Sequence, residues 1–306
     1  MRRANSADPE FGRENTATLE LRIGQSVRVS LEGEALCNGV RLSWQSFGEG
    51  PPVLLIAGTG APPVTWQVGG FVPALVESGY RVVTFANRGI EPSESPPGPY
   101  SVAEMAIDAA QLIEALDLSP CRVVGYSLGG QIAEELCYRY SEHVDEVVLL
   151  ASAGRGTAFC RLHVRAQVDL ATAMDPPLPS QMARDRLLFT QPSSVLQDDD
   201  DTVELVRSMI EASPPWTNPG RLGQWTAVAE WINDEKRTER WPLLTQRCLL
   251  IAFAHDVAFP PSRVREAAAA MPNAGFIEIA GAAHGGLLTH GEEVTQAVRK
   301  FFTRSS

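Results

Sequence analysis

The sequence predicts an α/β fold, with a mostly parallel, twisted sheet that opens with an antiparallel hairpin and has helices on both faces. Apolar runs of strand length alternate with helical segments along most of the chain, which is typical of parallel strands joined by crossover helices. An Asn-Gly pair near the start stands between two stretches of alternating polarity, which indicates a hairpin. One long segment without strand-like runs interrupts the alternation and predicts a helical insertion.

The hairpin is the first element. Residues Glu34 to Phe47, EALCNGVRLSWQSF, place Asn38 and Gly39 between the two alternating stretches. Asn and Gly both tolerate the positive φ angles that a two-residue turn between twisted strands requires. We therefore expect the sheet to begin with an antiparallel pair.

Strands and helices then follow each other in turn. We expect strands in the apolar runs, which are VLLIAG from Val53, RVVTFA from Arg81, Arg122 to Gly125, Glu146 to Leu150, CLLIAFA from Cys248 and FIEIAG from Phe276. We expect helices at about 71–78, 101–118, 128–140, 262–270 and 292–302. Because the strands are apolar on both sides, helices should cover both faces of the sheet.

The insertion runs from Gly156 to about Pro242. Four of the six tryptophans lie in it, namely Trp216, Trp225, Trp231 and Trp241. Their apolar surface is compatible with packing on the core and with roofing a pocket. We therefore expect an α/β core at 17–156 and 243–306 and a helical cap, or lid, at 157–242. Residues 1–16 are polar and aperiodic, which predicts a disordered arm or residues left by cloning.

Composition excludes several classes of partner. The 306 residues include 26 Lys or Arg and 37 Asp or Glu, so the formal net charge is −11. This charge repels phosphate backbones and anionic lipid surfaces, so we expect no nucleic acid and no membrane as partner. The longest apolar runs are much shorter than the roughly 20 residues that span a bilayer. Acidic residues also occupy the place of a signal peptide's apolar region.

The cysteines indicate a reducing compartment. There are five of them, widely spaced and without a CxxC pair, so neither a disulfide framework nor a zinc site is expected. We expect the cysteines to be small, buried, apolar side chains. We also expect the protein to be cytoplasmic. The acidic run Asp198 to Asp201 lacks the spaced ligands and the glycine of a calcium loop, so no metal is expected there.

The segment Gly125-Tyr126-Ser127-Leu128-Gly129 carries the clearest chemical signal. It is a G-x-S-x-G match between an apolar strand, RVVGYS, and a helix, LGGQIAEELCYRY. Such a strand-to-helix elbow needs small residues on both sides of the serine, because a side chain there would collide with the sharply turned backbone. The Ser127 hydroxyl is then exposed at the sheet edge, beside a helix N-terminus.

A serine nucleophile requires a base and a carboxylate that orients the base. In α/β folds with a G-x-S-x-G elbow, the order of these residues along the chain is Ser, then Asp or Glu, then His. His284 follows the last strand in the small-residue loop EIAGAAHGG, and Asp256 stands just past the strand that begins at Cys248. His255 and His290 are the competing histidines. We therefore predict Ser127, Asp256 and His284 as the catalytic residues.

The oxyanion formed on attack needs preorganised backbone donors. One is the amide of Leu128, directly after the nucleophile. The other should follow the first parallel strand, in AGTGAPPVTW. Thr59 is the candidate there, and Gly60 is the alternative.

These residues together resemble the α/β-hydrolase fold family over nearly the whole chain from about Glu34. The elbow GYSLGG, the strand tip with His255, Asp256 and Pro260, and the segment GAAH that ends at His284 match family motifs in family order. Within the family, IAGTG at 56–60 and NRGI at 87–90 are similar to a bacterial branch of cofactor-free haloperoxidases, perhydrolases and simple esterases. The resemblance implies a Ser-His-Asp hydrolase with a helical cap.

The sequence departs from the family pattern at several positions. Ala57-Gly58 stands where many members have His-Gly, and Ala86 stands where many have Asp. The loops around the pocket mouth are therefore expected to differ. Ser127 argues against haloalkane dehalogenases and epoxide hydrolases, whose nucleophile is Asp. Gly285 argues against the C–C bond hydrolases, which typically carry Trp after the histidine.

The predicted function is a serine hydrolase that cleaves a small, largely apolar ester, lactone or thioester through an acyl-enzyme, with no cofactor. Two alternatives stay open. The same residues could pass the acyl group to peroxide, or to an internal nucleophile in a cyclisation. The chain could also be a slow, ligand-binding member of the fold. In each case the partner is a small molecule, and the sequence leaves the oligomeric state open.

Overall fold

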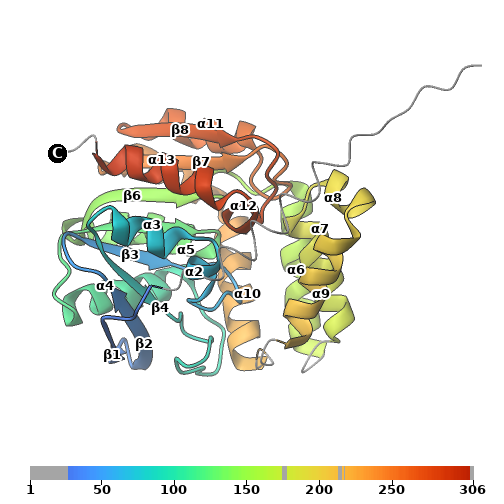
Figure 1. Cartoon of the computed structure of the whole chain (residues 1–306), viewed down its shortest axis with the longest axis horizontal. Helices are drawn as coiled ribbons and strands as arrows, with labels where there is room; N and C mark the ends of the chain where they lie inside the picture. Colours follow the sequence, from blue (N-terminus) through green and yellow to red (C-terminus); the bar gives the residue numbers. More distant parts are fainter. Residues whose placement is uncertain (1–26, 174–177, 213–215, 217, 304–306) are drawn as a thin grey trace, which may run out of the picture.

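The computed structural model describes residues 27–173, 178–212, 216 and 218–303, so the predicted arm at 1–16 lies outside the described residues. An eight-stranded sheet forms its centre, with strand order β1-β2-β4-β3-β5-β6-β7-β8 (Figure 1). The strands are β1 (Leu31–Cys37), β2 (Val40–Phe47), β3 (Pro52–Ile56), β4 (Arg81–Phe85), β5 (Cys121–Tyr126), β6 (Val144–Leu150), β7 (Arg247–Phe253) and β8 (Ala274–Ile279). Only β2 runs against the others, because it pairs antiparallel with both β1 and β4 while every other pairing is parallel.

Helices fill the connections. Those of the α/β part are α2 (Thr65–Val68), α3 (Phe71–Glu77), α4 (Val102–Ala115), α5 (Leu128–Arg139), the 3₁₀ turn η1 (Ser141–His143), α11 (Pro261–Ala270), α12 (Gly286–Thr289) and α13 (Gly291–Thr303). Between β6 and β7 lie α6 (Ala158–Ala173), α7 (Pro179–Thr190), α8 (Ser193–Asp198), α9 (Asp200–Ala212), α10 (Asn218–Asn233) and the 3₁₀ helix η2 (Glu235–Leu243). The expected strands and longer helices are therefore all present, with ends shifted by a few residues.

The hairpin forms as predicted. Cys37 pairs with Val40 across a two-residue turn, and the turn residues Asn38 and Gly39 have φ angles of 49° and 77°. The Asn38 side-chain amide also donates to Asp108 Oδ1 of α4 at 3.1 Å. This contact fixes the turn on the helix that packs beneath the hairpin.

Helices cover the sheet on both faces, and each face has its own hydrophobic core. Consecutive residues of β5 show the alternation, because Val123 belongs to one core and Val124 to the other. Residues of α4, α5, α10 and α11 complete the first core, and residues of α2, α3 and α13 complete the second. The expectation of a sheet covered on both sides is confirmed.

The segment between β6 and β7 has two parts. Figure 1 shows α6 to α9 together on one side of the molecule, with α10 between them and the sheet. Ala227, Trp231 and Ile232 of α10 and Trp241 of η2 are buried in the first core. Of the four tryptophans in this segment, Trp231 and Trp241 therefore pack in the core of the α/β part.

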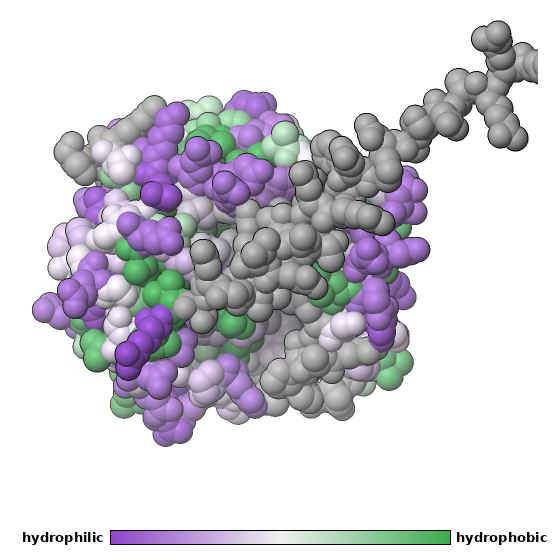
Figure 2. Space-filling model, viewed as in Figure 1, coloured by the Kyte–Doolittle hydropathy of each residue, from purple (hydrophilic) through white to green (hydrophobic). Residues whose placement is uncertain are grey.

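Among the coloured residues in Figure 2, hydrophilic surface predominates and hydrophobic patches lie between it. In the part of the chain that the structure describes, no helix combines the length and the apolar character needed to cross a bilayer. All five cysteines are buried free thiols, as the sequence predicts.

Candidate active site

Ser127 stands at the sharp turn between β5 and α5. Its φ and ψ angles are 54° and −119°, a backbone conformation that side chains other than glycine rarely adopt. Its amide donates to the Leu150 carbonyl of the neighbouring strand β6 at 2.9 Å. This bond holds the strained turn at the carboxyl edge of the sheet, with the Ser127 side chain half-buried.

The glycines of the elbow allow this turn. A Cβ atom at Gly125 would lie 2.2 Å from the Gly129 carbonyl oxygen, and one at Gly129 would lie 1.9 Å from the Ile56 carbonyl oxygen of β3. Both distances are far inside van der Waals contact. The predicted need for small residues is confirmed, and it arises from the neighbouring strand as well as from the elbow itself.

The structure brings Ser127, His284 and Asp256 together. His284 Nε2 lies 3.0 Å from Ser127 Oγ, and His284 Nδ1 lies 2.8 Å from Asp256 Oδ2. An ionised carboxylate only accepts hydrogen bonds, so the Nδ1 proton faces Asp256 and Nε2 is left to accept from the serine hydroxyl. Asp256 and His284 are only 2% and 3% exposed, which protects this chain of hydrogen bonds from competing water.

Asp256 is held by the backbone that follows β7. Its Oδ1 accepts from the amides of Ala258 at 2.8 Å and Phe259 at 3.0 Å. The two amides satisfy one carboxylate oxygen and stabilise its negative charge, while the other oxygen remains for His284. The local sequence thus fixes the orientation of the carboxylate.

The loop after β8 carries His284 over the sheet edge. The Tyr126 hydroxyl donates to the His284 carbonyl at 2.6 Å, and the Gly285 amide donates to the Thr190 carbonyl of α7 at 2.9 Å. Burial, and next the charge of Asp256, raise the pKa of Tyr126, so its phenol stays a donor at neutral pH. One core residue and one residue of the inserted helices therefore fix the loop.

Among the described residues, three of the other histidines form no hydrogen bond with Ser127 or Asp256. His255 is exposed, His290 Nδ1 contacts Thr289 Oγ1 at 2.8 Å, and His143 is paired with Glu114. His163 was not expected near the site. Its ring stacks on Phe189 with 4.4 Å between centroids, and Phe189 contacts His284 edge to face, also at 4.4 Å.

The loop after β3 lies against Ser127. A Cβ atom at Gly58 would be 3.2 Å from Ser127 Cβ, so the Gly58–Gly60 turn borders the serine. The Gly60 amide donates to Gln224 Oε1 of α10 at 2.9 Å, which removes the alternative oxyanion donor. The amides of Thr59 and Leu128 donate to no residue within the described ranges.

Two tryptophans of the segment between β6 and β7 lie close to the site, Trp216 in the connection between α9 and α10 and Trp225 in α10. The Trp216 ring packs on Gly60, where an added Cβ atom would lie 2.7 Å from it, and its Nε1 donates to the Gly89 carbonyl at 2.9 Å. The Trp225 ring meets His163 edge to face at 5.6 Å. Sequence reasoning missed His163, Phe189 and Gln224, because no local pattern tells which face of these helices meets the sheet.

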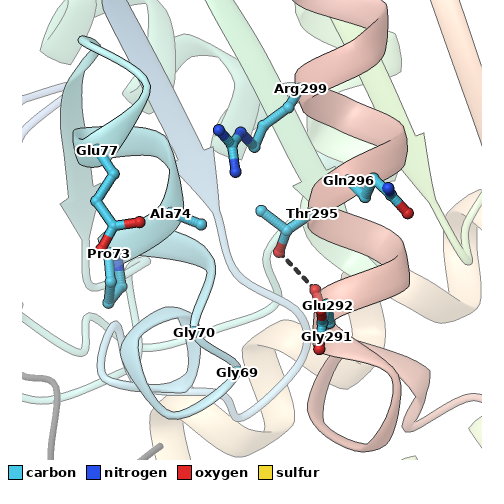
Figure 3. A pocket seen from close by; sticks show the side chains of 10 residues that line it. All are labelled: Gly69, Gly70, Pro73, Ala74, Glu77, Gly291, Glu292, Thr295, Gln296 and Arg299. Atoms are coloured by element: carbon cyan, nitrogen blue, oxygen red, sulfur yellow. Dashed lines mark hydrogen bonds between the residues drawn. The ribbon is translucent and has the colours of Figure 1, made fainter.

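A groove between α3 and α13 is separate from this site. Figure 3 shows side chains of both helices along it, with Arg299 pointing into the space between them. Its lining includes Gly69 of the loop after α2 and Thr295 of α13. None of Ser127, Asp256 and His284 lines the groove, so the reactive groups do not open into it.

Comparisons with known proteins identify the fold family. A family model of the alpha/beta hydrolase fold matches residues 51–291. This chain belongs to the α/β-hydrolase fold family. Among the relatives, the Mycobacterium tuberculosis protein that carries the name non-heme bromoperoxidase BpoC is 35% identical over 266 residues, covering 86% of this chain and 98% of the relative.

Solved structures of α/β hydrolases superpose well on the chain. The crystal structure of that Mycobacterium tuberculosis protein covers 92% of this chain and 99% of its own, with a TM-score of 0.78 at 33% identity. The enol-lactonase from Burkholderia xenovorans LB400 covers 89% and 100%, with a TM-score of 0.75 at 22% identity. At that lower identity the likeness concerns the fold alone.

Proposed function

We propose that this α/β hydrolase is a serine hydrolase that cleaves a carboxylic ester, lactone or thioester through an acyl-enzyme. The hydrogen-bonded chain from Ser127 Oγ through His284 to Asp256 carries the proposal. His284 takes the Ser127 proton as the hydroxyl attacks the carbonyl, and it returns the proton to the leaving group. Asp256 holds the imidazole in the tautomer that the attack requires. A water molecule then repeats the cycle on the acyl-enzyme.

The amides of Leu128 and Thr59 are the proposed oxyanion donors. Leu128 opens α5, so its amide belongs to the positive end of the helix. Thr59 follows Gly58, which borders Ser127. The Gly60 amide is already bound to Gln224, which supports Thr59 as the donor of this loop.

The substrate is proposed to be small and largely apolar near the scissile bond. Phe189, Phe259 and Tyr126 surround the His284 ring. We propose that the inserted helices act as a cap that selects the substrate, because α7 supplies Phe189 and the carbonyl that binds Gly285. Buried free thiols favour a reducing compartment, and we propose the cytoplasm.

A second candidate function uses the same residues. The name of the relative that is 35% identical favours perhydrolysis, in which hydrogen peroxide replaces water and attacks the acyl-enzyme to release a peracid and free Ser127. Peracid formation from acetate or an ester in the presence of hydrogen peroxide distinguishes it. With an ester as substrate, a yield of peracid that exceeds the yield of free carboxylic acid would favour the second candidate.

The first test is Ser127→Ala. We expect loss of labelling by a fluorophosphonate probe and a fall in kcat for 4-nitrophenyl esters of about 10⁴-fold or more, since these residues act as a unit. Circular dichroism and the melting temperature report whether the fold is kept. If the folded variant retained most of the activity, the hydrolase proposal at this site would fail. If the parent chain neither turned over esters nor reacted with the probe, a slow binding protein would be the better description.

A further inference from the structure

One cation of the inserted helices faces the candidate site. Arg186, Phe189 and Thr190 of α7 are spaced by three and four residues, so they share one face of the helix. This face rests on the His284 loop, because the Phe189 ring lies 4.4 Å from the His284 ring and the Thr190 carbonyl accepts from the Gly285 amide at 2.9 Å. Arg186 lies one turn before these contacts, on the same side.

Arg186 is exposed to solvent. Desolvation by the neighbouring protein lowers the pKa of its guanidinium, and the nearby Tyr126 phenol partly offsets this. Its charge in turn helps to lower the pKa of His163. Tyr126 and His163 both belong to the ring cluster around His284. The face of α7 that Arg186 shares with Phe189 and Thr190 therefore places it beside the site, and solvent reaches it there.

Arg186 has no ion-pair or hydrogen-bond partner for its guanidinium among the residues that the structure describes. Its neighbour differs in this respect. The Arg184 guanidinium binds Asp185 Oδ1 at 2.8 Å, and Gln167 also donates to Asp185 at 3.3 Å. Two residues of a helix that are two positions apart lie on nearly opposite sides, so Arg184 points away from the face that carries Arg186.

We propose that Arg186 binds a carboxylate of the substrate, so that the enzyme prefers esters, lactones or thioesters that carry a second, ionised carboxyl group. The inference rests on the proposed serine hydrolase function. A planar guanidinium binds a carboxylate through two parallel hydrogen bonds, and partial desolvation strengthens that bond. An arginine on the helix face that contacts the His284 loop thus discriminates between an acidic substrate and its neutral analogue.

The test compares matched substrates. Mono-4-nitrophenyl glutarate and 4-nitrophenyl pentanoate differ by the carboxylate on the acyl side, and the butyrate esters of 4-hydroxybutyrate and of butanol differ by it on the alcohol side. We expect the parent chain to prefer the acidic member of at least one pair in kcat/KM. Arg186→Gln should reduce that preference by about 10- to 100-fold, mainly through KM, as expected for a hydrogen bond to a charged group. Arg186→Lys should restore part of it.

Arg184→Gln is the matched control, because it removes an equal charge two residues away and should leave both preferences unchanged. Fluorophosphonate labelling of Ser127 is measured in every variant, with each ester as competitor, so that a poor substrate is still scored as a ligand. A parent chain that shows no preference in turnover or in protection would overturn the role of Arg186, and so would equal losses in the two arginine variants. Absence of labelling in the parent would instead contradict the proposed function itself.

Discussion

At the scale of single residues, close backbone contacts determine where the reactive atoms lie. Ser127 adopts a positive φ angle, and its neighbours Gly125 and Gly129 fit only because they lack Cβ atoms. Asp256 is oriented by two backbone amides rather than by a charged neighbour. The positions of the hydroxyl and the carboxylate therefore depend on turns whose geometry a few residues define.

Replacing Asp256 with asparagine tests this arrangement. The amide would favour the wrong imidazole tautomer while keeping the size of the side chain, so kcat should fall by about 10³- to 10⁴-fold with little change in KM. Steady-state kinetics on a 4-nitrophenyl ester measures the effect. Asp185→Asn in α7 is the control, because it removes a carboxylate from the inserted helices. A larger loss in the control than in Asp256→Asn would show that the acid has been assigned to the wrong residue.

At the scale of elements, single side chains join the inserted helices to the sheet. Gln224 of α10 is fully buried. Its Oε1 accepts from the Gly60 amide, and its Nε2 donates to the Arg88 carbonyl, both at 2.9 Å. One amide group thus holds the loops after β3 and β4 in a fixed relation to α10 and keeps Thr59 near Ser127.

Gln224→Leu should therefore affect stability and rate together. It leaves the Gly60 amide and the Arg88 carbonyl without partners, which costs about 1–3 kcal/mol for each buried group. We expect a lower free energy of unfolding in urea and a lower kcat, because the Thr59 amide loses its support. Gln45→Leu, which removes an exposed bond to Glu32, should change neither. If kcat were unaffected in a destabilised Gln224→Leu variant, the bridge would serve stability alone.

The contact between His163 of α6 and Phe189 of α7 leads to a second prediction at this scale. Burial between aromatic rings lowers the pKa of His163 to about 4 from its usual 6.5. Between these two values the unfolded chain binds more protons than the folded one, so stability should fall as the pH is lowered from about 6.5 to about 4. Over this pH range, the melting temperature of the His163→Phe variant should fall less than that of the parent. Equal pH profiles for the two proteins would show that His163 does not contribute to the acid sensitivity.

At the scale of the whole molecule, two hydrophobic cores stabilise the sheet and the helices on its two faces. The helices proposed to select the substrate lie largely outside these cores. The sheet with α4, α5 and α10 forms one core, and α3 and α13 cover the other face. Trp231 and Trp241 are buried with the first core, so α10 and η2 stabilise the sheet although they follow the break in the α/β pattern. Among the residues whose burial the structure describes, only Phe189 of α7, which meets the His284 ring, connects helices α7 to α9 with either core.

This division predicts the outcome of a helix replacement. Exchanging Pro179 to Ala212 for a short Gly-Ser linker should leave a folded chain whose Ser127 still reacts with a small fluorophosphonate. The dependence of kcat/KM on acyl chain length should change, because Phe189 and Arg186 are lost. The rate on every ester should also fall, because the His284 loop loses the Thr190 carbonyl. A screen of 4-nitrophenyl esters from acetate to decanoate measures it. An unchanged profile in the folded variant would mean that these helices do not select the substrate.

Local sequence patterns predict the secondary-structure elements and the candidate catalytic residues. Apolar runs, the turn at Asn38-Gly39 and the spacing of Gly125, Ser127 and Gly129 are local patterns, and local backbone preferences act within a few residues. The same is true of Asp256 and His284, each of which follows an apolar strand. These residues were therefore predictable without knowledge of how the strands are arranged.

How these elements pack against each other depends on the tertiary structure. The order β2-β4-β3, the capture of the Gly60 amide by Gln224 and the approach of Arg186 to the site depend on contacts between distant segments. Gly60 and Gln224, for example, are 164 residues apart. The sequence periodicity of a helix shows that one of its faces is apolar. Which residues of that face make contacts depends on the shape of the surface that packs against the helix. The proposed nucleophile could thus be named from the sequence, whereas the residues that surround its substrate required the packed molecule.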